Sequence, residues 1–588
     1  MSKRRAEEAK EENEPSAVMA RLSWQLAMRD DVEVAQGLYA GEEIEELHEL
    51  SEAGLLDEFF VFLKDIGMLA VLEEQELPGV QRVLVPTVQF LLLYLLKVLF
   101  GGQSMHALPR VLFSHLPLME LIGFNARQVE QGLTKRGDAQ RQSKKKQGPL
   151  TPQCLADTIS KLTQEQMETL FNAMVRCVVA WGLLDGERLA ALDGSKLPTP
   201  KTYAGCGKLK QTRSVKVKGQ KEPATQEYYV YGWKVLVLID VHTRLPLAMK
   251  VVQIQEYEGR WLVPLLEQAQ HNLGTRGHIS TIVIDRGYLD GEDLWRVDQL
   301  GVRFVIVSKS NMSVTQDAQA LAKRERVRTR ERVVRHGHGK TATEERVRTE
   351  LVGIEGLTTY DSYGDPEYSR QAQRRDYEGH PINAVVVRRW ENWTPTTGGT
   401  VYLTHGPVTD PFVIFDTYDW RSVIENGIFK EGKHPWHLLN FPKKTAAAVV
   451  VHSHLTILAM ALCTAFRLWQ AKSATTPTTS THETATTPSV STALLGGEGI
   501  ARWRLRLKEE NRDKVIIFLG EVYGIFHLAE LAVLTGMRLK RLPPHLGSSQ
   551  SILQRFGISP SFLYQNIRRL MAVLDRSLEA CYSAQTFL

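Results

Sequence analysis

The sequence predicts an α/β protein, with a mixed β-sheet that carries packed helices. In residues 187–308, strand-like runs rich in β-branched and aromatic residues are followed by amphipathic helical runs. Their order is three strands, helix, strand, helix, strand, which is typical of a mixed sheet covered by helices. Residues 1–186 instead place apolar residues at three- and four-residue spacing, as helices do. At 588 residues the chain is too long for one ordinary core, so we expect two to four domains.

The overall charge says little about the partner. The net charge is only +5, from 72 basic and 67 acidic residues, so local clusters must indicate any nucleic-acid surface. The five cysteines are scattered without CxxC pairs, which argues against a zinc finger or a disulfide framework and fits a reducing cytoplasm. The apolar runs 88–100 and 446–466 predict buried core helices, and the N-terminus lacks a signal-peptide core. We therefore expect a cytoplasmic protein without a membrane partner.

The domains follow from these patterns in chain order. We expect a helical N-terminal region (1–186), the first part of the sheet domain (187–308), a β-rich insertion (309–411), the second part of the sheet domain (412–470), a Thr/Ser/Pro-rich flexible linker (471–494) and a C-terminal module (495–588). The loop 133–150 contains Lys144, Lys145 and Lys146, which fit either a solvated linker or a phosphate-contacting loop. We expect the charged run 321–350 to form a solvated surface. We expect no metal site at His336 and His338 within it.

Three carboxylates are the most informative residues. Asp193 is predicted to end the first strand and Asp285 the fourth, while Glu425 lies on a charged helix further along. Brought together on a rigid sheet, such residues can hold two divalent cations, because Mg²⁺ and Mn²⁺ prefer hard oxygen ligands. Two such ions can activate the attacking oxygen and stabilise the leaving oxygen of a phosphodiester. The pattern therefore predicts an enzyme that cuts phosphodiesters.

The helix with Glu425 adds a phosphate-binding face. At 100° per residue, Arg421 lies about 40° and Tyr418 about 20° from Glu425. Arginine binds phosphate through paired, charge-assisted hydrogen bonds. Taken alone, Arg421 and Glu425 also fit an ordinary ion pair on a helix surface.

Other carboxylates compete for the metal role. They are Asp240, Asp416, Asp419 and Glu431, and each is predicted to be structural. Asp240 precedes a hairpin-like turn, where aspartate favours turn geometry. Trp420 and Trp436 are close to the site in sequence, and a core or lid role fits both as well as a DNA contact does.

These motifs together resemble a DDE transposase of bacterial insertion sequences, in the branch with the motif Tyr-x2-Arg-x3-Glu-x6-Lys. The resemblance rests on Asp193-Gly194-Ser195, on Asp285-Arg286-Gly287-Tyr288, and on the spacing of Tyr418, Arg421 and Glu425. It covers about residues 85–470, and the β-rich insertion before the glutamate is typical of that branch. The motif lysine is missing, because its position is Gly432. Lys433 follows it and Lys430 precedes it, and Lys433 can serve if the helix ends or loosens at Gly432.

The resemblance implies a ribonuclease-H-like core with Asp193, Asp285 and Glu425 as catalytic and metal-binding residues. It implies two Mg²⁺ ions, which Mn²⁺ can replace, and cleavage at the ends of a transposon followed by joining of the 3′ ends to target DNA. It also implies double-stranded DNA with terminal inverted repeats as the partner, a homodimer on paired ends, and a protein associated with the nucleoid when bound to DNA. The N-terminal helical region is expected to recognise the terminal repeats.

Further DNA contacts are expected in the segment 201–221, which is rich in Lys and Arg and contains no acid. We interpret it as a flexible basic loop next to Asp193, with Lys208, Lys210 and Arg213 as DNA-binding residues. Two other functions stay open from the sequence: a nuclease that does not join strands, and a domesticated or decayed transposase that only binds DNA.

Overall fold

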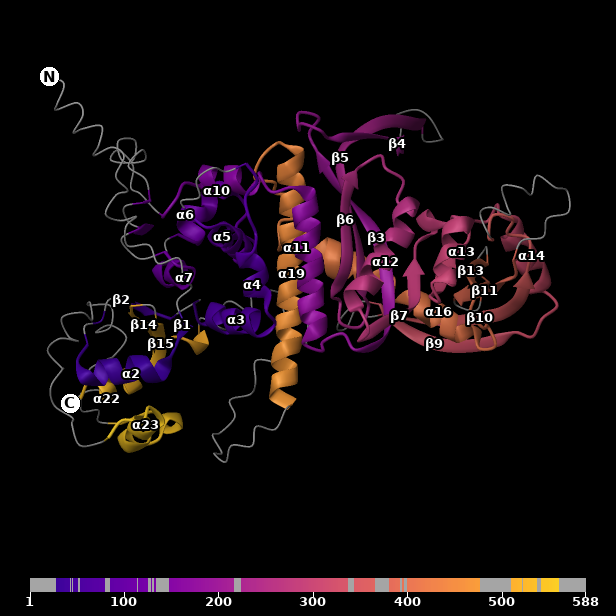
Figure 1. Cartoon of the computed structure of the whole chain (residues 1–588). Coiled ribbons are helices and arrows are strands. Elements are labelled where there is room, and N and C mark those ends of the chain that lie inside the picture. Colours follow the sequence, from indigo (N-terminus) through magenta and orange to yellow (C-terminus); the bar gives the residue numbers. More distant parts are fainter. Residues whose placement is uncertain are drawn as a thin grey trace, which may run out of the picture. The chain divides into compact units, whose positions relative to one another are not determined.

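The computed structural model describes residues 28–559 apart from 43, 45, 51–52, 80–84, 114, 125–127, 130–131, 134–147, 216–223, 337–342, 365–379, 392–393, 396–398, 476–508, 521 and 537–540. The basic loop at Lys144–Lys146, His338 and most of the predicted linker lie outside these residues, as do residues 560–588 of the predicted C-terminal module. The chain divides into two compact units (Figure 1): Met1–Leu162 with Phe466–Leu588, and Thr163–Ala465. Each contains both helices and a sheet, so the predicted α/β class is confirmed.

The first unit is built from both ends of the chain, and we call it the terminal unit. Its four-stranded sheet has the order β1-β15-β14-β2. Its elements are β1 (Met28–Arg29), α2 (Asp31–Ala40), β2 (Glu46–Glu49), α3 (Ala53–Asp65), α4 (Met68–Glu73), α5 (Thr87–Leu99), η1 (Met105–Ala107), α6 (Leu108–Val111), α7 (Leu116–Leu121), α10 (Pro152–Ile159), β14 (Lys514–Leu519), β15 (Val522–His527), α22 (Leu528–Leu534), η7 (Pro544–Leu546) and α23 (Ser549–Arg555).

The C-terminal residues therefore do not form a separate appended module as predicted. A two-stranded hairpin such as β14–β15 is marginally stable alone and exposes two edges. In the structure β2 pairs with one edge and β1 with the other. One apolar core then joins Val34 and Leu38 of α2 to Val515, Phe526 and Phe556. This long-range pairing is not visible in local sequence patterns.

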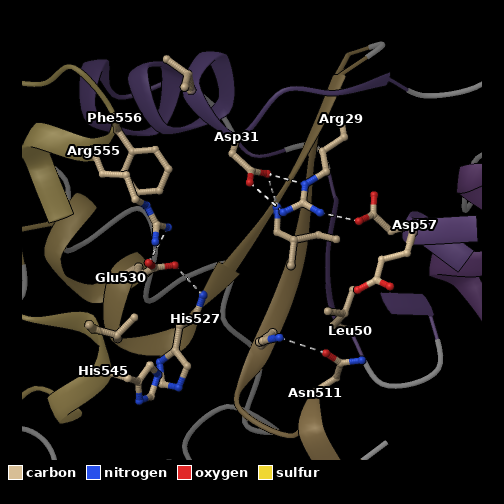
Figure 2. Close-up of a pocket in the computed structure, with 15 residues that line it drawn as sticks. Arg29, Asp31, Leu50, Asp57, Asn511, His527, Glu530, His545, Arg555 and Phe556 are labelled. Carbon is tan, nitrogen blue, oxygen red and sulfur yellow. Dashed lines mark hydrogen bonds and ion pairs between the residues drawn. The ribbon is translucent and has the colours of Figure 1, made fainter. Parts of the chain in front are cut away.

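A polar cavity of about 570 Å³ lies where the two chain ends meet (Figure 2). Arg29 donates to Asp31 at 2.7 Å and also pairs with the buried Asp57. The hydroxyl of Tyr523 donates to Asp57 at 2.6 Å. Residues almost 500 positions apart are thus linked through one buried carboxylate, which fixes β1 against β15.

The shared core makes a testable prediction. Phe526 is fully buried and packs against Phe556, so Phe526→Ala is expected to destabilise the terminal unit by about 3–5 kcal/mol. Hydrogen exchange should show lost protection in residues 28–49 as well as in 514–556. The exposed Val333→Ala is the control and should change neither segment. Loss confined to 514–556 would show that the chain ends fold separately.

The predicted helix at residues 88–100 is α5, and all of its residues are buried, including Lys97 at 1% exposure. Burial lowers the pKa of Lys97 to about 8, and its ammonium lies 5.1 Å from the Tyr94 ring centre. Below that pKa the fold contains a buried charge, which is unfavourable.

Lys97→Met is therefore expected to stabilise the protein at pH 7 by about 1–3 kcal/mol. Because the unfolded chain binds more protons between about pH 8 and 10.5, the wild-type protein gains stability over this window and the advantage of the variant shrinks. Calorimetry at pH 7 and pH 10, with the exposed Lys64→Met as control, measures this. An advantage for Lys97→Met that is equal at both pH values would contradict the buried charge.

The second unit is the sheet domain predicted from residue 187 onward. Its described strands form one mixed sheet of the order β4-β5-β3-β7-β8-β13-β11-β10-β9, with β6 also paired to β5 and β12 to β11. The strands are β3 (Gly186–Thr199), β4 (Gly207–Val215), β5 (Ala224–Asp240), β6 (Pro246–Gln253), β7 (Gly277–Ile284), β8 (Arg303–Val307), β9 (Arg328–His336), β10 (Thr343–Leu357), β11 (Ile382–Glu391), β12 (Thr394–Pro395) and β13 (Thr400–Thr404).

The helices of this unit are α11 (Gln164–Ala180), η3 (Gly259–Trp261), α12 (Leu262–Leu273), η4 (Arg286–Tyr288), α13 (Gly291–Gln299), α14 (Ser313–Leu321), α16 (Pro411–Asp419), α17 (Ser422–Ile424), the π-helical segment η6 (Glu425–Lys430), α18 (Glu431–Lys433) and α19 (Ala446–Thr475), whose last residues belong to the terminal unit. α12 packs on β5, β6 and β7, and α11 packs on α12 and β6. Strands β9 to β13 of the predicted insertion extend the same sheet, because β13 pairs with β8.

Residues Ala446–Lys472 of α19 are long and apolar enough to cross a membrane, but 89% of the most apolar stretch is buried inside the protein. This is the burial expected for a core helix.

Candidate active site

Asp193 and Asp285 lie side by side on neighbouring parallel strands. The last parallel pair between β3 and β7 is Leu192 with Ile284, so the two aspartates are the next residues on each strand. Asp285 ends β7 as predicted and accepts a hydrogen bond from the amide of Arg286 at 2.8 Å. Asp193 does not end its strand, because β3 continues to Thr199 in pairing with β5. Asp193 thus follows the last residue of β3 that pairs with β7, although β3 itself continues.

Gly194 directly after Asp193 is closely packed, so a larger residue there would need neighbouring side chains to shift. A Cβ atom there would lie 2.7 Å from the side chain of Leu236 and 2.8 Å from a carboxylate oxygen of Glu258. The amide of Gly194 donates to Asp193 at 2.7 Å, which fixes one carboxylate oxygen. The Asp-Gly pair therefore combines a held carboxylate with a backbone that neighbouring groups can approach.

Arg421 joins Asp193 to the helix that carries Glu425. Its guanidinium lies 3.4 Å from Asp193 Oδ2 and 3.6 Å from Glu425 Oε2. Glu425 is 64% exposed, whereas Asp193 is only 17% exposed. The structure thus brings a half-buried arginine between one sheet carboxylate and one helix carboxylate. Among the described residues, the oxygens of Asp193, Asp285 and Glu425 do not all come within 4.8 Å of one another.

The surroundings of Asp193 disfavour its charge. Burial raises the pKa of the Asp193 carboxyl to about 6; the Gly194 amide and Arg421 oppose this rise, and Asp285 and Glu258 add to it. Burial likewise raises the pKa of Tyr418, whose ring packs on Tyr402 with centres 4.9 Å apart. Asp193 and Asp285 also contribute to the Tyr418 shift, so this tyrosine lies in the field of both aspartates.

Residues 185–462 match the family model for a transposase DDE domain. This segment is similar to transposase DDE domains. No curated protein matches the chain. Among solved structures, it is similar to a piggyBac transposase in a synaptic complex with hairpin DNA, at 8% identity and a TM-score of 0.33, over 78% of this chain and 80% of that chain. That likeness is too distant to define a fold or a ligand.

The second unit contains a further acidic residue near the site that the sequence did not single out. Glu258, at the start of η3, raises the pKa of Asp193 and pairs with the buried Lys234 at 2.7 Å. Tyr288 is also buried beside these carboxylates, and burial raises its pKa well above the ordinary value. Only the closeness of Glu258 to Gly194 in space reveals its place, because its sequence context shows no motif.

The competing carboxylates of the second unit mostly have structural partners. Asp240 is fully buried and accepts hydrogen bonds from the Thr243 amide and hydroxyl at 2.8 and 2.6 Å. Asp416 pairs with Arg330 at 2.6 Å, and Glu431 accepts from the Trp436 indole at 3.3 Å. Trp436 is a core residue at 3% exposure, whereas Trp420 is 44% exposed.

The helix of Glu425 contains an extra residue in its turn. A π-helical turn closes with i→i+5 hydrogen bonds, so it holds one residue more than an α-helical turn, and every later residue is rotated back by about 100°. In an uninterrupted α-helix Gly432 would lie about 20° from Glu425; after the π segment Gly432 lies about 120° and Lys433 about 20° from Glu425.

The burial pattern agrees with this rotation. Gly432 is buried, with Leu438 and Met460 3.4 and 3.5 Å from the position a Cβ would take, and Ile424 on the same side is fully buried. Glu425 stays exposed. The π segment therefore moves Gly432 into the core and brings Lys433 onto the face of Glu425. From the sequence, Lys433 could serve if the helix ended or loosened at Gly432; in the structure the helix instead widens before Gly432 and continues to Lys433.

The predicted DNA-binding residues Lys208, Lys210 and Arg213 lie on β4 and not on a flexible loop. They pair against the first half of β5, forming a two-stranded ribbon. The ammonium of Lys208 lies 3.9 Å from the Tyr229 ring centre, and Lys210 pairs with Glu227 at 2.7 Å. Arg213 donates to Gln226. The many lysines of this segment suggested a loop, whereas its residues pair as a strand and contact aromatic side chains of β5.

The terminal unit holds one group of possible metal ligands among the described residues. Glu46, His48 and Glu120 place ligand atoms within 4.8 Å of one another. His48 Nε2 lies 3.6 Å from Glu46, whose side chain is partly exposed, and 3.3 Å from the buried Glu120.

Proposed function

We propose that the chain is an active transposase that cuts DNA at the ends of an insertion sequence and joins the 3′ ends to target DNA. The observation that carries this is the DDE domain in which Arg421 holds the strand-borne Asp193 and the helix-borne Glu425, with Asp285 on the next strand. A ribonuclease-H-like core is supported by the sheet. β5 is antiparallel to its neighbours β3 and β6, whereas β7 is parallel to β3 and β8 is parallel to β7. Helix α12 precedes β7, and α13 connects β7 to β8.

The residues fit divalent cations. Asp193 is largely removed from water and lies in the field of two further carboxylates, a surplus of negative charge that a hard cation would offset. Asp193, Asp285 and Glu425 would hold two Mg²⁺ ions, or Mn²⁺ in their place. The ions would supply the charge that activates the attacking oxygen and stabilises the leaving oxygen.

The side chains around the carboxylates would bind the DNA backbone. Arg421 holds its two carboxylates in place and offers its remaining N–H groups to phosphate. Tyr418 and Lys433 share the face of Glu425 and would add a hydroxyl and a cation. Burial lowers the pKa of Lys433, and a phosphate beside its ammonium group would oppose this effect by favouring the charged form.

The ribbon of β4 and β5 would contact duplex DNA further from the carboxylates. Lys208 and Lys210 lie on one of its faces and Arg213 on the other, and a two-stranded ribbon is of a size that enters a major groove. We infer that the chain belongs to the bacterial branch with the Tyr-x2-Arg-x3-Glu motif, acts as a homodimer on paired ends, and works in the cytoplasm on the nucleoid.

The test is cleavage of DNA carrying the ends of the element that encodes the chain. Purified protein with Mg²⁺ should cut at the ends, and chelation of the metal should stop cutting while leaving DNA binding measurable. A protein that binds these ends and never cuts them with Mg²⁺ or Mn²⁺ would be the decayed, DNA-binding form instead.

A further inference from the structure

A polar cluster of the terminal unit joins an edge strand to a helix. Glu46 and His48 are two residues apart on β2, so their side chains lie on the same face of the strand. Leu47 between them is on the other face and packs on the shared apolar core. Glu120 of α7 meets the polar face, with a carboxylate oxygen 3.3 Å from His48 Nε2. One imidazole and two carboxylates from two separate elements therefore converge.

The distances in this cluster fit a shared cation better than hydrogen bonds. His48 Nε2 is buried, and no hydrogen bond from the described residues reaches it. Its separations of 3.6 Å from Glu46 and 3.3 Å from Glu120 exceed the usual range of about 2.7–3.2 Å for such bonds. A single ring N–H also donates well to only one of two carboxylates.

A tetrahedral metal site has the spacing that this cluster shows. With metal–ligand bonds of about 2.0–2.15 Å to nitrogen and oxygen, neighbouring ligand atoms lie about 3.3–3.5 Å apart. The two separations from His48 Nε2 are close to this range, and all three ligand atoms lie within 4.8 Å of one another. One small ion can therefore contact all three side chains with little movement of the chain.

The charges and the ligand types favour Zn²⁺ as this ion. Glu120 is only 7% exposed, and a charged carboxylate with so little access to water is normally paired or bound to a metal. A neutral imidazole with two carboxylates carries two negative charges, which one divalent ion neutralises. Imidazole is a good ligand for Zn²⁺, whereas Mg²⁺ prefers oxygen ligands and retains several waters.

We propose that Glu46, His48 and Glu120 bind one Zn²⁺ ion, with water as the fourth ligand. The ion would fasten β2 to α7. Because β2 covers one edge of the β14–β15 hairpin, the ion would also stabilise the pairing of the N-terminal and C-terminal segments. The site uses no cysteine and belongs to the terminal unit, so it does not rest on the proposed function or on the Mg²⁺ site proposed for the second unit.

Counting the zinc bound to the full chain tests this site. The protein is stripped with a chelator, dialysed with Zn²⁺ and freed of loose metal, all in an Asp285→Asn background that weakens zinc binding at the proposed catalytic carboxylates. One Zn²⁺ per chain should remain, and added Zn²⁺ should raise the thermal midpoint. Glu46→Gln should weaken zinc affinity at least about tenfold. Its side chain is 37% exposed, so this variant should fold.

The matched control is Glu49→Gln, an exposed glutamate on the other face of β2, which should keep the zinc. Hydrogen exchange locates the ion, because Zn²⁺ should raise amide protection in both 46–49 and 116–121. His48→Gln should remove this rise in both segments.

Three results would overturn the inference: a background protein that retains no Zn²⁺, equal zinc affinity in the background protein and Glu46→Gln, or an equal loss of zinc in Glu49→Gln. The cluster would then be an ion pair between His48 and the two glutamates. None of these measurements uses DNA or cleavage, so their failure leaves the proposed function intact.

Discussion

Asp285→Asn is expected to lower the rate of DNA cleavage roughly a thousandfold, the upper range for loss of one group that stabilises a transition state. Asp285 directly follows β7, whose last residues are buried, and its carboxylate accepts a hydrogen bond from the Arg286 amide at 2.8 Å. Asparagine preserves this hydrogen bond and the shape of the site but removes the charge that a divalent cation needs. Folding and DNA affinity should therefore change little.

The control for this variant is Asp416→Asn, on α16, which precedes the segment of Glu425. Asp416 is about half exposed and pairs with Arg330, a surface ion pair of small value. Single-turnover cleavage of end DNA with Mg²⁺ should show about wild-type rates for this control. Comparable rates for Asp285→Asn and the wild type would show that Asp285 is not a catalytic residue.

The exchange Gly432→Lys with Lys433→Gly should lower cleavage by about a hundredfold, in the range for one lost charge contact to the reacting phosphate. The exchange restores the seven-residue spacing from Glu425 that the resemblance implies. Because of the π-helical turn, however, it moves the lysine to the side that packs on Leu438 and Met460. The lysine would then be buried and unable to reach phosphate, so stability should fall as well.

Deletion of Gly427 tests the helical register of Lys433 without changing the lysine itself. Removing one residue from the π segment should convert it to an α-helical turn and place Lys433 seven residues from Glu425 on the same face. This variant should keep far more activity than the exchange. If the exchange were fully active and the deletion inactive, the lysine would lie where an uninterrupted helix puts it and the π-helical register would be wrong. Far-ultraviolet circular dichroism and the thermal midpoint of each variant should accompany the rates.

Local signals predicted the parts of the site that depend on local structure. Asp285 was predicted at a strand end because an apolar run stops there, and Arg421 and Glu425 were predicted on one face because four residues make about one helical turn. Asp193 was misplaced in its strand because β3 continues past it in pairing with β5, a partner that lies more than 30 residues away. Glu258 was missed because its closeness to Gly194 also arises from contacts between distant parts of the chain.

Three other features depended on interactions that a single segment does not show. The widened helical turn before Gly432 is compensated by burial of Ile424 and Gly432, which only the packed core reveals. Lysine density suggested a loop where β4 pairs with β5, and the C-terminal strands needed β1 and β2 to cover their edges. In each case tertiary pairing overrode the local pattern.

The most direct test of the central claim is strand transfer. The protein, Mg²⁺, a labelled duplex ending in the terminal repeat of the element and a supercoiled plasmid should give labelled DNA joined covalently to the plasmid, and the product should be absent with Glu425→Gln. Cleavage of the labelled end without any joined product, under conditions where DNA binding is complete, would contradict a transposase and identify a nuclease on the same core.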